Sequence, residues 1–381
     1  MYGLEKAYLT PNPREEAKAF VGSRRAVADS FVEHISRIIK SGRVPKAVLW
    51  GAFGTGKTHF CYYVKMRLAD IAKVVYVECP PCHRRTKYSE LHAAIMRKIG
   101  REYALGLIEQ TIREANRTGK PLAEALGLDQ DLTAVIRGGF GSDRTTLWRY
   151  LSGQKLGARE VRLIDAISPQ IREDDAVAIV NSIAKLVGSQ EKRQLFIMID
   201  EFENTHALLG DSLMMFIGAV RGLVDESSDV GVVFIASVRS MDEMPFIIVE
   251  DPVRRRIGLT NFIYYKEYTR QELEELIHQL IEFRREKEFN LDRVLKEDLE
   301  NITENINART YPFTQEAINI AIDKVLELRE SGEIPSIRPK EALDLLDYAL
   351  ALGAQDKIPV LTSEFVGKVL AKSPLALESR V

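Results

Sequence analysis

One stretch of eight residues restricts the fold of this chain more than any other feature of the sequence. It fits the pattern GxxxxGK[ST] at every fixed position and reads Gly51-Ala52-Phe53-Gly54-Thr55-Gly56-Lys57-Thr58. The apolar residues 47–50 before it are typical of a short buried strand, and residues 59–68 after it have the pattern of an amphipathic helix. A strand, this loop and a helix define a P-loop, whose glycines let backbone N–H groups turn inward around phosphates.

The P-loop predicts that the chain binds ATP. Lys57 is expected to reach the β- and γ-phosphates, and Thr58 is expected to ligate Mg²⁺. The N-terminus of the following helix adds partial positive charge at the same place. The alternative is a glycine-rich turn that binds no nucleotide, which the full match and its context disfavour. We assign nucleotide contacts to the whole loop and the next residue: Gly51, Ala52, Phe53, Gly54, Thr55, Gly56, Lys57, Thr58 and His59.

A second apolar run, at residues 195–199, ends in Asp200 and Glu201. A continuous apolar run is typical of a strand buried in a parallel sheet, and the carboxyl end of such a strand lies at the ligand-binding edge. We predict that Asp200 holds Mg²⁺, as a Walker B aspartate does. Glu201 is then the candidate general base that polarises the attacking water. A solvated acidic turn is the alternative, since Glu203 adds another acid nearby.

The composition agrees with a well-folded chain of two or three domains. The 381 residues are 45% hydrophobic and 28% charged, with a net charge of −2. This balance neither requires nor excludes a nucleic-acid partner. No apolar run approaches the roughly 18 residues of a membrane span, and residues 1–6 lack the basic and apolar regions of a signal peptide. We therefore expect a cytoplasmic protein with no membrane partner.

The three cysteines are Cys61, Cys79 and Cys82. Residues 79–83 match the haem attachment pattern C-x-x-C-H, but the P-loop and the expected compartment argue against covalent haem. A zinc site needs four ligands, and this region offers two cysteines with His83 or His92. A buried strand end followed by a Pro-Pro turn is the favoured interpretation, ahead of a metal or redox role.

The remaining pattern places helices around further strands. A strand is expected at 74–77, and more than 110 residues separate it from the run at 195–199, which is too many for a simple crossover. This insert, about 88–187, is expected to be helical. Its predicted helices run from Tyr88 to about Ala115, up to about Gly153, and from 174 to 187. A helix at 214–224 and strands at 230–237 and 261–265 follow the second apolar run.

From Thr269 onward the pattern is purely helical. Helices are predicted at 272–286, 291–306, 314–328 and 339–352, with a short element at 360–370. The predicted fold class is α/β, with a P-loop parallel sheet, a large helical insert and an all-helical lid. We place the ATPase core at 1–268 and the lid domain at 269–381.

The order of these parts resembles the AAA+ ATPases, particularly the initiator clade with its origin-recognition and Cdc6-like members. Residues 20–24 resemble the segment F-x-G-R that lies near adenine in that clade, with Ser23 where the family usually has arginine and Arg24 one place later. Residues 235–237 resemble the sensor 1 strand end. This resemblance implies that Ser237 contacts the γ-phosphate or the attacking water, with Ser240 as a nearby alternative.

Two further segments of the resemblance concern basic residues. Residues 251–256 fall where AAA+ proteins carry an arginine finger, which implies that Arg254, Arg255 or Arg256 reaches the ATP of a neighbouring subunit. A homo-oligomer or other AAA+ subunits are then expected as partners, and a solvated basic turn is the alternative. Residues 336–343 resemble the start of the sensor 2 helix. Either Arg338 or Lys340 is the implied phosphate contact, and ordinary helix-start charges are the alternative.

The insert carries a narrower resemblance. Residues 146–156 resemble the segment L-x-x-W-L-x-G-x-x-L of the ATP-binding proteins of BREX-type phage defence. In that family the segment also lies between a P-loop and Asp-Glu-x-Glu, which residues 200–203 match here. The alternative is an amphipathic helix whose Trp148 and Leu151 simply pack into the core.

These features predict a Mg²⁺-dependent ATP hydrolase that couples ATP binding and hydrolysis to conformational change. The resemblances imply DNA-associated work, of the loader, initiator, transposition or phage-defence type. The basic residues within 82–87 are candidates for contacts with DNA phosphates. The alternative function is a slow nucleotide-dependent switch, which binds an unidentified protein partner through the helical insert.

Overall fold

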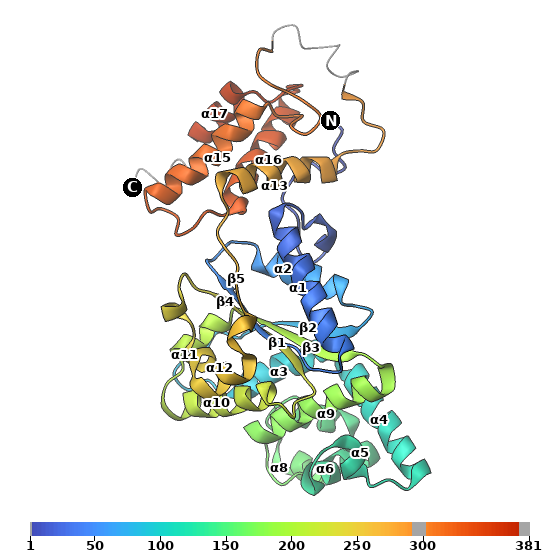
Figure 1. Cartoon of the computed structure of the whole chain (residues 1–381). Coiled ribbons are helices and arrows are strands. Elements are labelled where there is room, and N and C mark those ends of the chain that lie inside the picture. Colours follow the sequence, from blue (N-terminus) through green and yellow to red (C-terminus); the bar gives the residue numbers. More distant parts are fainter. Residues whose placement is uncertain (1, 292–301, 373–381) are drawn as a thin grey trace. The chain divides into compact units, whose positions relative to one another are not determined.

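The computed structural model describes residues 2–291 and 302–372 of the chain. They form two compact units (Figure 1). The P-loop–lid unit lies within Met1–Ser30, Gly51–Tyr63 and Tyr265–Val381. The sheet unit comprises Phe31–Trp50 and Val64–Tyr264. Two helices run from one unit into the other along the chain, α1 (Ser23–Lys40) and α2 (Lys57–Arg67).

A parallel five-stranded sheet with the order β2-β3-β4-β1-β5 forms the centre of the sheet unit (Figure 1). Its register pairs Val75 with Ile197 and Ile199 with Phe234. All five apolar residues at 195–199 are fully buried, as their continuous run predicts. The predicted α/β fold with a parallel sheet is therefore confirmed. The strands are β1 (Lys46–Gly51), β2 (Ala72–Glu78), β3 (Gln194–Asp200), β4 (Gly231–Ser237) and β5 (Phe262–Tyr264).

The segment between β2 and β3 is helical, and α3 contacts β2 while α9 contacts β3. The single helix predicted from Tyr88 to about Ala115 is wrong, because Gly100 separates two helices. Gly100 has φ 96°, a left-handed conformation that ends an α-helix. The helices are α3 (Tyr88–Ile99), α4 (Arg101–Thr118), α5 (Leu122–Leu126), α6 (Gln130–Gly141), α7 (Arg144–Leu151), α8 (Ala158–Leu163) and α9 (Glu173–Glu191).

The rest of the sheet unit follows β3. The predicted helix before β4 is present as α10 (Gly210–Val224). The sequence patterns did not indicate that the basic residues at 254–256 belong to a helix, which is α12 (Asp251–Ile257). The other short elements are α11 (Phe246–Val249), η2 (Phe202–Ala207), η3 (Met241–Glu243) and η4 (Leu259–Asn261).

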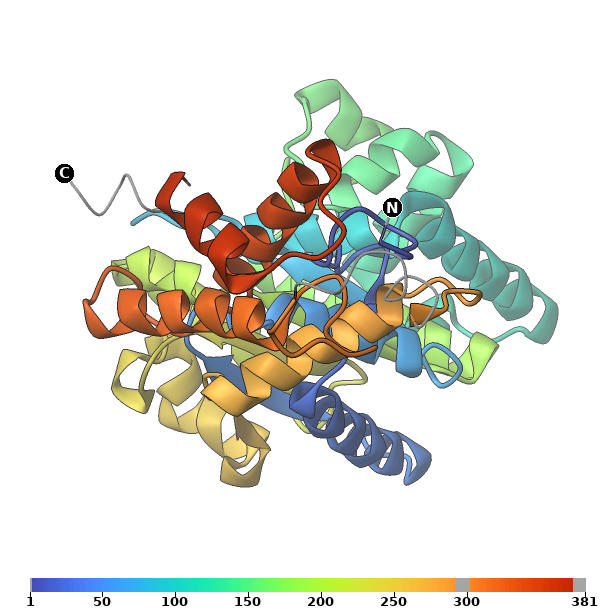
Figure 2. The same cartoon turned by 90° about the horizontal axis from the view of Figure 1, so that it is seen from above.

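Helices make up most of the lid in the P-loop–lid unit (orange to red in Figures 1 and 2). Their apolar faces form a second core, in which Ile277, Phe313 and Leu346 are fully buried. Most of the helix predicted at 291–306 lies outside the described residues, which exclude 292–301; of its described residues, Leu291 is helical and 302–306 are not. The described lid helices are α13 (Arg270–Arg284), α15 (Gln315–Glu330), α16 (Pro339–Gln355) and α17 (Ser363–Lys372).

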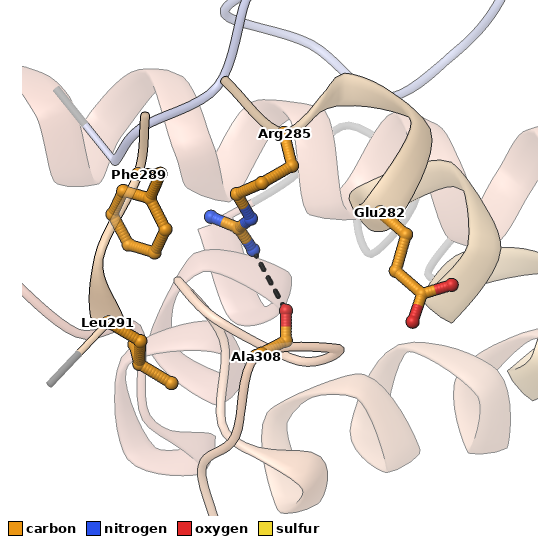
Figure 3. Close-up of a pocket in the computed structure, with 5 residues that line it drawn as sticks. All are labelled: Glu282, Arg285, Phe289, Leu291 and Ala308. Carbon is orange, nitrogen blue, oxygen red and sulfur yellow. Dashed lines mark hydrogen bonds between the residues drawn. The ribbon is translucent and has the colours of Figure 1, made fainter. Parts of the chain in front are cut away.

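Arg285, the first residue after α13, contacts main-chain carbonyls and an aromatic ring (Figure 3). Its guanidinium donates hydrogen bonds to the backbone oxygens of Tyr2 and Ala308, at 3.1 and 3.2 Å. It also lies 4.5 Å from the ring centroid of Phe289. Arg285, Phe289 and Ala308 line a small pocket together with Glu282 and Leu291. Because main-chain carbonyls and an aromatic ring already engage the arginine, its role here is structural.

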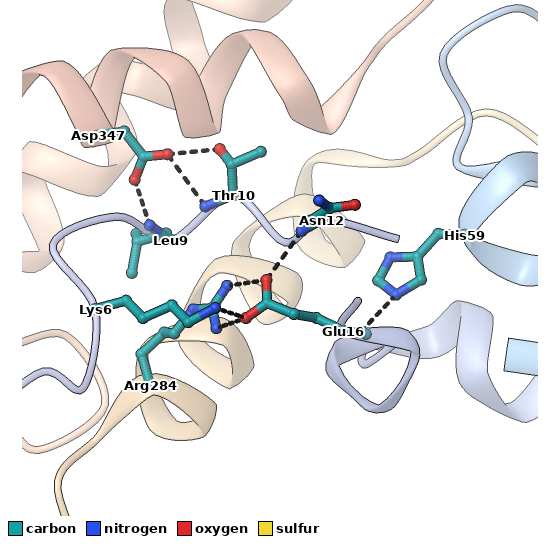
Figure 4. A network of polar contacts seen from close by, with 8 residues as sticks. All are labelled: Lys6, Leu9, Thr10, Asn12, Glu16, His59, Arg284 and Asp347. Carbon is teal, nitrogen blue, oxygen red and sulfur yellow. Dashed lines mark hydrogen bonds and ion pairs between the residues drawn. The ribbon is translucent and has the colours of Figure 1, made fainter. Parts of the chain in front are cut away.

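The N-terminal segment, residues 2–22, binds along the lid through buried polar contacts (Figure 4). Asp347 on α16 accepts hydrogen bonds from the backbone N–H groups of Leu9 and Thr10. Glu16 forms an ion pair with Arg284 at the end of α13, and their side chains are only 10% and 3% exposed. The hydrogen bonds from Arg284 are the main cause that lowers the pKa of Glu16 to about 2, from 4.5.

We predict that Glu16→Gln lowers the free energy of unfolding by about 3 kcal/mol, because it leaves the Arg284 guanidinium buried without its counter-charge. Urea denaturation at pH 7 measures this loss. Because the folded pKa is depressed, the contribution of Glu16 is present above pH 4.5 and is lost as the pH falls toward 2. The difference between wild type and variant should therefore shrink over that range. Glu15→Gln, at an exposed neighbour, is the control, and an equal loss there would contradict the assignment.

Candidate nucleotide-binding site

The P-loop has the backbone conformation that its glycines permit. Gly54 and Gly56 have φ of 80° and 93°, in the left-handed region that other residues rarely adopt. A Cβ at Gly51 would lie 2.1 Å from the backbone oxygen of Tyr265. The loop follows β1, and α2 begins at Lys57, so a helix N-terminus with its N–H groups borders the loop. This geometry fits the phosphate-binding role predicted from the sequence.

Lys57 is held at the loop itself. Its side-chain ammonium donates hydrogen bonds to the backbone oxygens of Gly51 and Ala52, at 2.9 and 2.7 Å. The residue is only 5% exposed, and burying an ammonium is unfavourable unless it is hydrogen-bonded. Thr55 closes the turn by donating to the same Ala52 oxygen, at 2.9 Å. The positive charge is therefore fixed at the loop, next to the exposed Thr58.

The lid contacts the P-loop through the segment that precedes α16. The fully buried Ser336 donates a hydrogen bond of 2.7 Å to the backbone oxygen of Phe53. The guanidinium of Arg338 lies 5.6 Å from the ring centroid of Phe53, and a Cβ at Gly54 would lie 2.3 Å from Cδ of Arg338. Lys340, two residues further on, is solvent-exposed. Of the two residues implied as sensor 2, Arg338 is thus the one packed on the loop.

Residues 20–24 are anchored to the segment that leads into the lid. Arg24 is 4% exposed, and its guanidinium donates 2.7 Å to the backbone oxygen of Glu267. It also lies 5.1 and 4.5 Å from the ring centroids of Tyr265 and Tyr268. Burial raises the pKa of Tyr268 to about 12, so this phenol stays neutral beside the arginine. Ser23 instead donates to Glu272 on α13, at 2.9 Å.

His59 joins the start of α2 to the N-terminal segment. Its ring lies 5.1 Å from the ring of Phe20, and Nε2 is 3.2 Å from the backbone oxygen of Glu16 (Figure 4). Burial lowers the pKa of His59, so the ring is neutral near pH 7. A neutral ring packed on Phe20 suits an apolar contact better than a contact with phosphate.

In the sheet unit, Asp200 is the last residue of β3 and is 3% exposed. Its Oδ2 accepts a 2.7 Å hydrogen bond from the Tyr76 hydroxyl on β2, and its Oδ1 accepts one of 2.9 Å from the backbone N–H of Glu201. These two hydrogen bonds orient the carboxylate group. Its oxygens are the hard ligands that Mg²⁺ prefers.

Glu201 and Glu203 have different surroundings. Glu201 has φ 55°, and its exposed side chain follows the strand directly. Partial desolvation, and then the negative charges of Asp200, Glu78 and Glu203, raise its pKa. Glu203 accepts a 2.9 Å hydrogen bond from the backbone N–H of Ser237 at the end of β4. Glu203 therefore connects two strand ends, whereas Glu201 keeps a carboxyl group directed at solvent.

Cys79 belongs to the same hydrogen-bonded cluster. Its backbone N–H donates 2.7 Å to the oxygen of Asp200, and its own oxygen accepts 2.9 Å from the Asn204 side chain. Cys79 is buried and Cys82 is half-buried, and both are free thiols. Cys79 thus directly follows β2 as a buried residue before the Pro-Pro turn.

The three arginines of α12 differ in exposure. Arg255 is the most exposed, at 79% of its side chain, and pairs with Asp251 at 2.7 Å. Arg254 pairs with the same Asp251 at 2.8 Å. Arg256 is 31% exposed and pairs with Asp225 at 3.1 Å. Hydrogen bonds from Ser227, and then from Arg256, lower the pKa of Asp225 to about 2. Arg256 therefore ties α12 to the end of α10, whereas Arg255 points to solvent.

The structure brings some of the predicted residues together within each unit. Ser237, the last residue of β4, lies one strand from Asp200, whereas Ser240 lies beyond the strand at the start of η3. Tyr76, Asn204 and Ser336 hold parts of the site but were not predicted from the sequence. Nothing in their local sequence distinguishes them, because strand register and long-range packing bring them to their partners.

The fold of the chain is similar to those of solved ORC proteins. Aeropyrum pernix ORC1 in complex with DNA is 15% identical, with 96% of this chain and 68% of that chain covered and a TM-score of 0.50. The ADP form of A. pernix ORC2 is 14% identical, with 94% and 71% covered and a TM-score of 0.52. Drosophila ORC bound to DNA is 12% identical, with 96% and 67% covered and a TM-score of 0.51.

This likeness confirms, at the level of the fold, the resemblance to initiator AAA+ ATPases. No protein-family model matches the sequence, and no curated protein matches it either. Within the described part of the chain, no helix has both the length and the apolar character needed to cross a membrane.

We predict that Gly54→Ala is more destabilising than Gly42→Ala. Both glycines have positive φ, at 80° and 75°, but a Cβ at Gly42 would meet nothing within 4 Å. Each substitution should lose about 1–2 kcal/mol from left-handed strain. Gly54→Ala should lose about 1–3 kcal/mol more by overpacking against Arg338. Urea denaturation of both variants, and of Gly54→Ala combined with Arg338→Ala, measures the excess. If Gly54→Ala combined with Arg338→Ala does not regain this excess stability loss, Arg338 does not pack on the loop in solution.

Proposed function

We propose that this chain binds ATP with Mg²⁺ and hydrolyses it, and that hydrolysis changes the contact between its lid and its P-loop. The observation that carries the proposal is the order of the strands. β4 lies between β1 and β3 in a parallel sheet, so their carboxyl ends follow one another along one edge. The P-loop leaves from β1, Ser237 ends β4, and Asp200 ends β3. Ligands bind at this edge of α/β sheets.

The residues present fit a metal-bound triphosphate. The P-loop offers backbone N–H groups, the Lys57 ammonium and the Thr58 hydroxyl, and Asp200 offers an oriented carboxylate. Thr58 and Asp200 would hold Mg²⁺, which when bound neutralises phosphate charge during phosphoryl transfer. Lys57 would exchange its hydrogen bonds to the loop carbonyls for phosphate oxygens. Such charge-assisted hydrogen bonds are roughly twice as strong as neutral ones.

Glu201 is the proposed general base. It has a solvent-directed carboxyl group and a raised pKa, which bring it closer to the range useful for accepting a proton near pH 7. Glu203 is engaged with the Ser237 backbone and is better suited to hold β3 and β4 in register. Ser237 would position the attacking water from the end of the intervening strand.

Arg338 is the proposed sensor 2 residue, in preference to Lys340. It leads directly into α16 and already packs on Phe53 and Gly54, so a change at the phosphates can reach the lid through it. Ser336 strengthens the same connection through its hydrogen bond to the Phe53 backbone. The division into a core at 1–268 and a lid at 269–381 is part of this proposal.

Three substitutions test the chemistry. Lys57→Ala should nearly abolish ATP binding, because it removes the positive charge from the loop. Glu201→Gln should bind ATP normally, while hydrolysis falls by roughly two orders of magnitude or more. Glu203→Gln is the matched control and should keep most of the turnover. Fluorescent-nucleotide titration measures binding, and phosphate release measures turnover.

Each outcome bears on a different part of the proposal. Unchanged hydrolysis by Lys57→Ala would remove the P-loop from the site. Normal turnover in Glu201→Gln, together with a loss in Glu203→Gln, would transfer the role of base to Glu203.

We also propose that the active form is an oligomer in which α12 faces a neighbouring copy. Large apolar side chains are exposed on the elements next to α12: Phe246 on α11 is 58% exposed, and Leu259 on η4 is 71% exposed. Exposed apolar groups of this kind often mark interfaces. Arg255 lies on α12, between these two elements in the chain. Its surface ion pair with Asp251 contributes little to stability, so Arg255 can exchange it for a contact with a neighbouring copy. Arg255 is therefore the favoured finger and Arg254 the second candidate, whereas Arg256 is structural.

We predict that Arg255→Ala lowers turnover by about 100-fold or more with little change in ATP affinity, because a finger acts mainly in the transition state. Arg256→Ala should instead lower stability, since it removes the ion pair that ties α12 to Asp225. Mixing Arg255→Ala with Lys57→Ala subunits should restore partial activity, because each supplies what the other lacks. Turnover that does not depend on protein concentration, in a protein that stays monomeric with ATP, would contradict a finger acting in trans.

The DNA-associated work remains part of the proposal. The solved ORC1 and Drosophila ORC with this fold were determined with DNA, which makes DNA the first partner to test. Loader, initiator, transposition and phage-defence roles all combine DNA with ATP, and the short BREX-like segment at 146–156 favours the last. The second candidate is a slow switch that binds a protein through the insert, which exposed Ile167 and Leu163 favour.

A further inference from the structure

Within the helical insert, α6, α7 and α8 form a small packed element to which ATP chemistry assigns no role. Only Ser142 and Asp143 separate α6 from α7. A Cβ at Gly139 on α6 would lie 2.6 Å from Cβ of Leu147 on α7, so the two helices cross in close contact. The Ser142 hydroxyl donates 2.7 Å to the backbone oxygen of Leu163 at the end of α8. A short turn between two closely packed helices is one feature of a helix-turn-helix.

The turn between the two helices is well defined. Asp143 caps α7: its carboxylate accepts 2.8 Å from the backbone N–H of Thr145 and 2.7 Å from the Thr146 hydroxyl. These hydrogen bonds lower the pKa of Asp143, with the Thr146 hydroxyl as the largest cause. The start of α7 is therefore fixed relative to α6, as a helix that reads a rigid partner requires.

The second helix has one buried face and one accessible face. Leu147, Tyr150 and Leu151 are buried in the core of the insert. Arg144 and Thr145 are exposed. Trp148 and Arg149, one turn further on, are half-buried. Of the two residues that the alternative interpretation placed in the core, Leu151 is buried there and Trp148 packs against it while partly exposed. The accessible face is thus polar and basic, with an aromatic ring beside it.

The element carries positive charge in a chain whose net charge is −2. From the start of α6 to the end of α8, residues 130–163, the acidic residues are Asp131, Asp143 and Glu160. Asp131 is exposed, whereas Asp143 is engaged in the cap of α7 and Glu160 with Arg149 and the Gly157 N–H. From α4, Glu109 also faces this helix and accepts from both Arg144 guanidinium nitrogens at 3.0 Å. The basic residues of the same stretch are Arg137, Arg144, Arg149, Lys155, Arg159 and Arg162.

The loop after α7 returns alongside it. Arg149 lies 3.4 Å from the side-chain oxygen of Gln154 and 3.5 Å from the backbone oxygen of Lys155. Lys155 and Arg159 are exposed, the first in this loop and the second at the start of α8. Exposed cations beside an accessible helix face complement the phosphates that border a DNA groove.

We propose that α6 and α7 form a helix-turn-helix that binds double-stranded DNA, with α7 in the major groove and Lys155 and Arg159 on the flanking phosphates. The inference rests on the proposed DNA-associated function for its choice of partner. A duplex is favoured over structured RNA because the B-form major groove admits a helix, whereas the A-form groove is too deep and narrow. Glu109 opposes binding, since it competes with phosphate for Arg144.

The test is fluorescence anisotropy of a labelled 30-base-pair duplex with the full chain, titrated at several salt concentrations. Lys155→Ala combined with Arg159→Ala should lower the affinity about tenfold and reduce the salt slope by about two contacts. Glu109→Gln should instead tighten binding, a gain that a merely structural role would not produce. Lys40→Ala combined with Arg43→Ala removes the same charge from another exposed segment and should change binding far less.

The outcomes separate this inference from the proposed function. Turnover without DNA should be the same in all of these variants, because none of them belongs to the ATP machinery. DNA binding by a Lys57→Ala chain that cannot turn over ATP would leave the helix-turn-helix intact. No binding by wild type, equal losses in the two double variants, or preferential competition by an RNA hairpin would overturn the inference. Binding unaffected by Glu109→Gln would remove α7 from the contact.

Discussion

The rest of the sheet unit depends on the parallel pairing of its strands in the order β2-β3-β4-β1-β5. Parallel strands present their carboxyl ends at one edge, so residues far apart in the chain become neighbours there. Asp200 and Ser237 are separated by a helix and a long connection in sequence, but they end adjacent strands. Without this pairing, Asp200 and Ser237 would not lie at neighbouring strand ends.

The buried carboxylate of Asp200 illustrates how that edge is maintained. An ionised carboxylate is unfavourable in a buried position unless it is hydrogen-bonded. Tyr76 and the backbone of Glu201 supply those bonds, and Glu203 and Asn204 link the neighbouring strand ends to the same turn. The turn that carries Glu201 is therefore braced from β2 and from β4. The position of Glu201 is therefore set by residues from two neighbouring strands.

The helical insert shows a different use of the same sheet. α3 and α9 contact the strands and extend the core, whereas α6 to α8 form a packed element of their own within it. The insert thus combines helices that cover the sheet with a group of helices that pack mainly on one another. In the P-loop–lid unit, Ser336 and Arg338 give the lid a direct contact with the loop.

The sequence by itself determined the P-loop, the buried strand before Asp200 and the parallel α/β class, because each follows from local spacing and continuous apolar runs. It misjudged the helix across Gly100, where a left-handed glycine interrupts an otherwise helical pattern. Only the tertiary structure decided which residues meet: that Tyr76 holds Asp200, that Arg338 rather than Lys340 packs on the loop, and that α6 crosses α7 at Gly139. Strand register and side-chain packing set these contacts, and they join residues that local sequence patterns cannot connect.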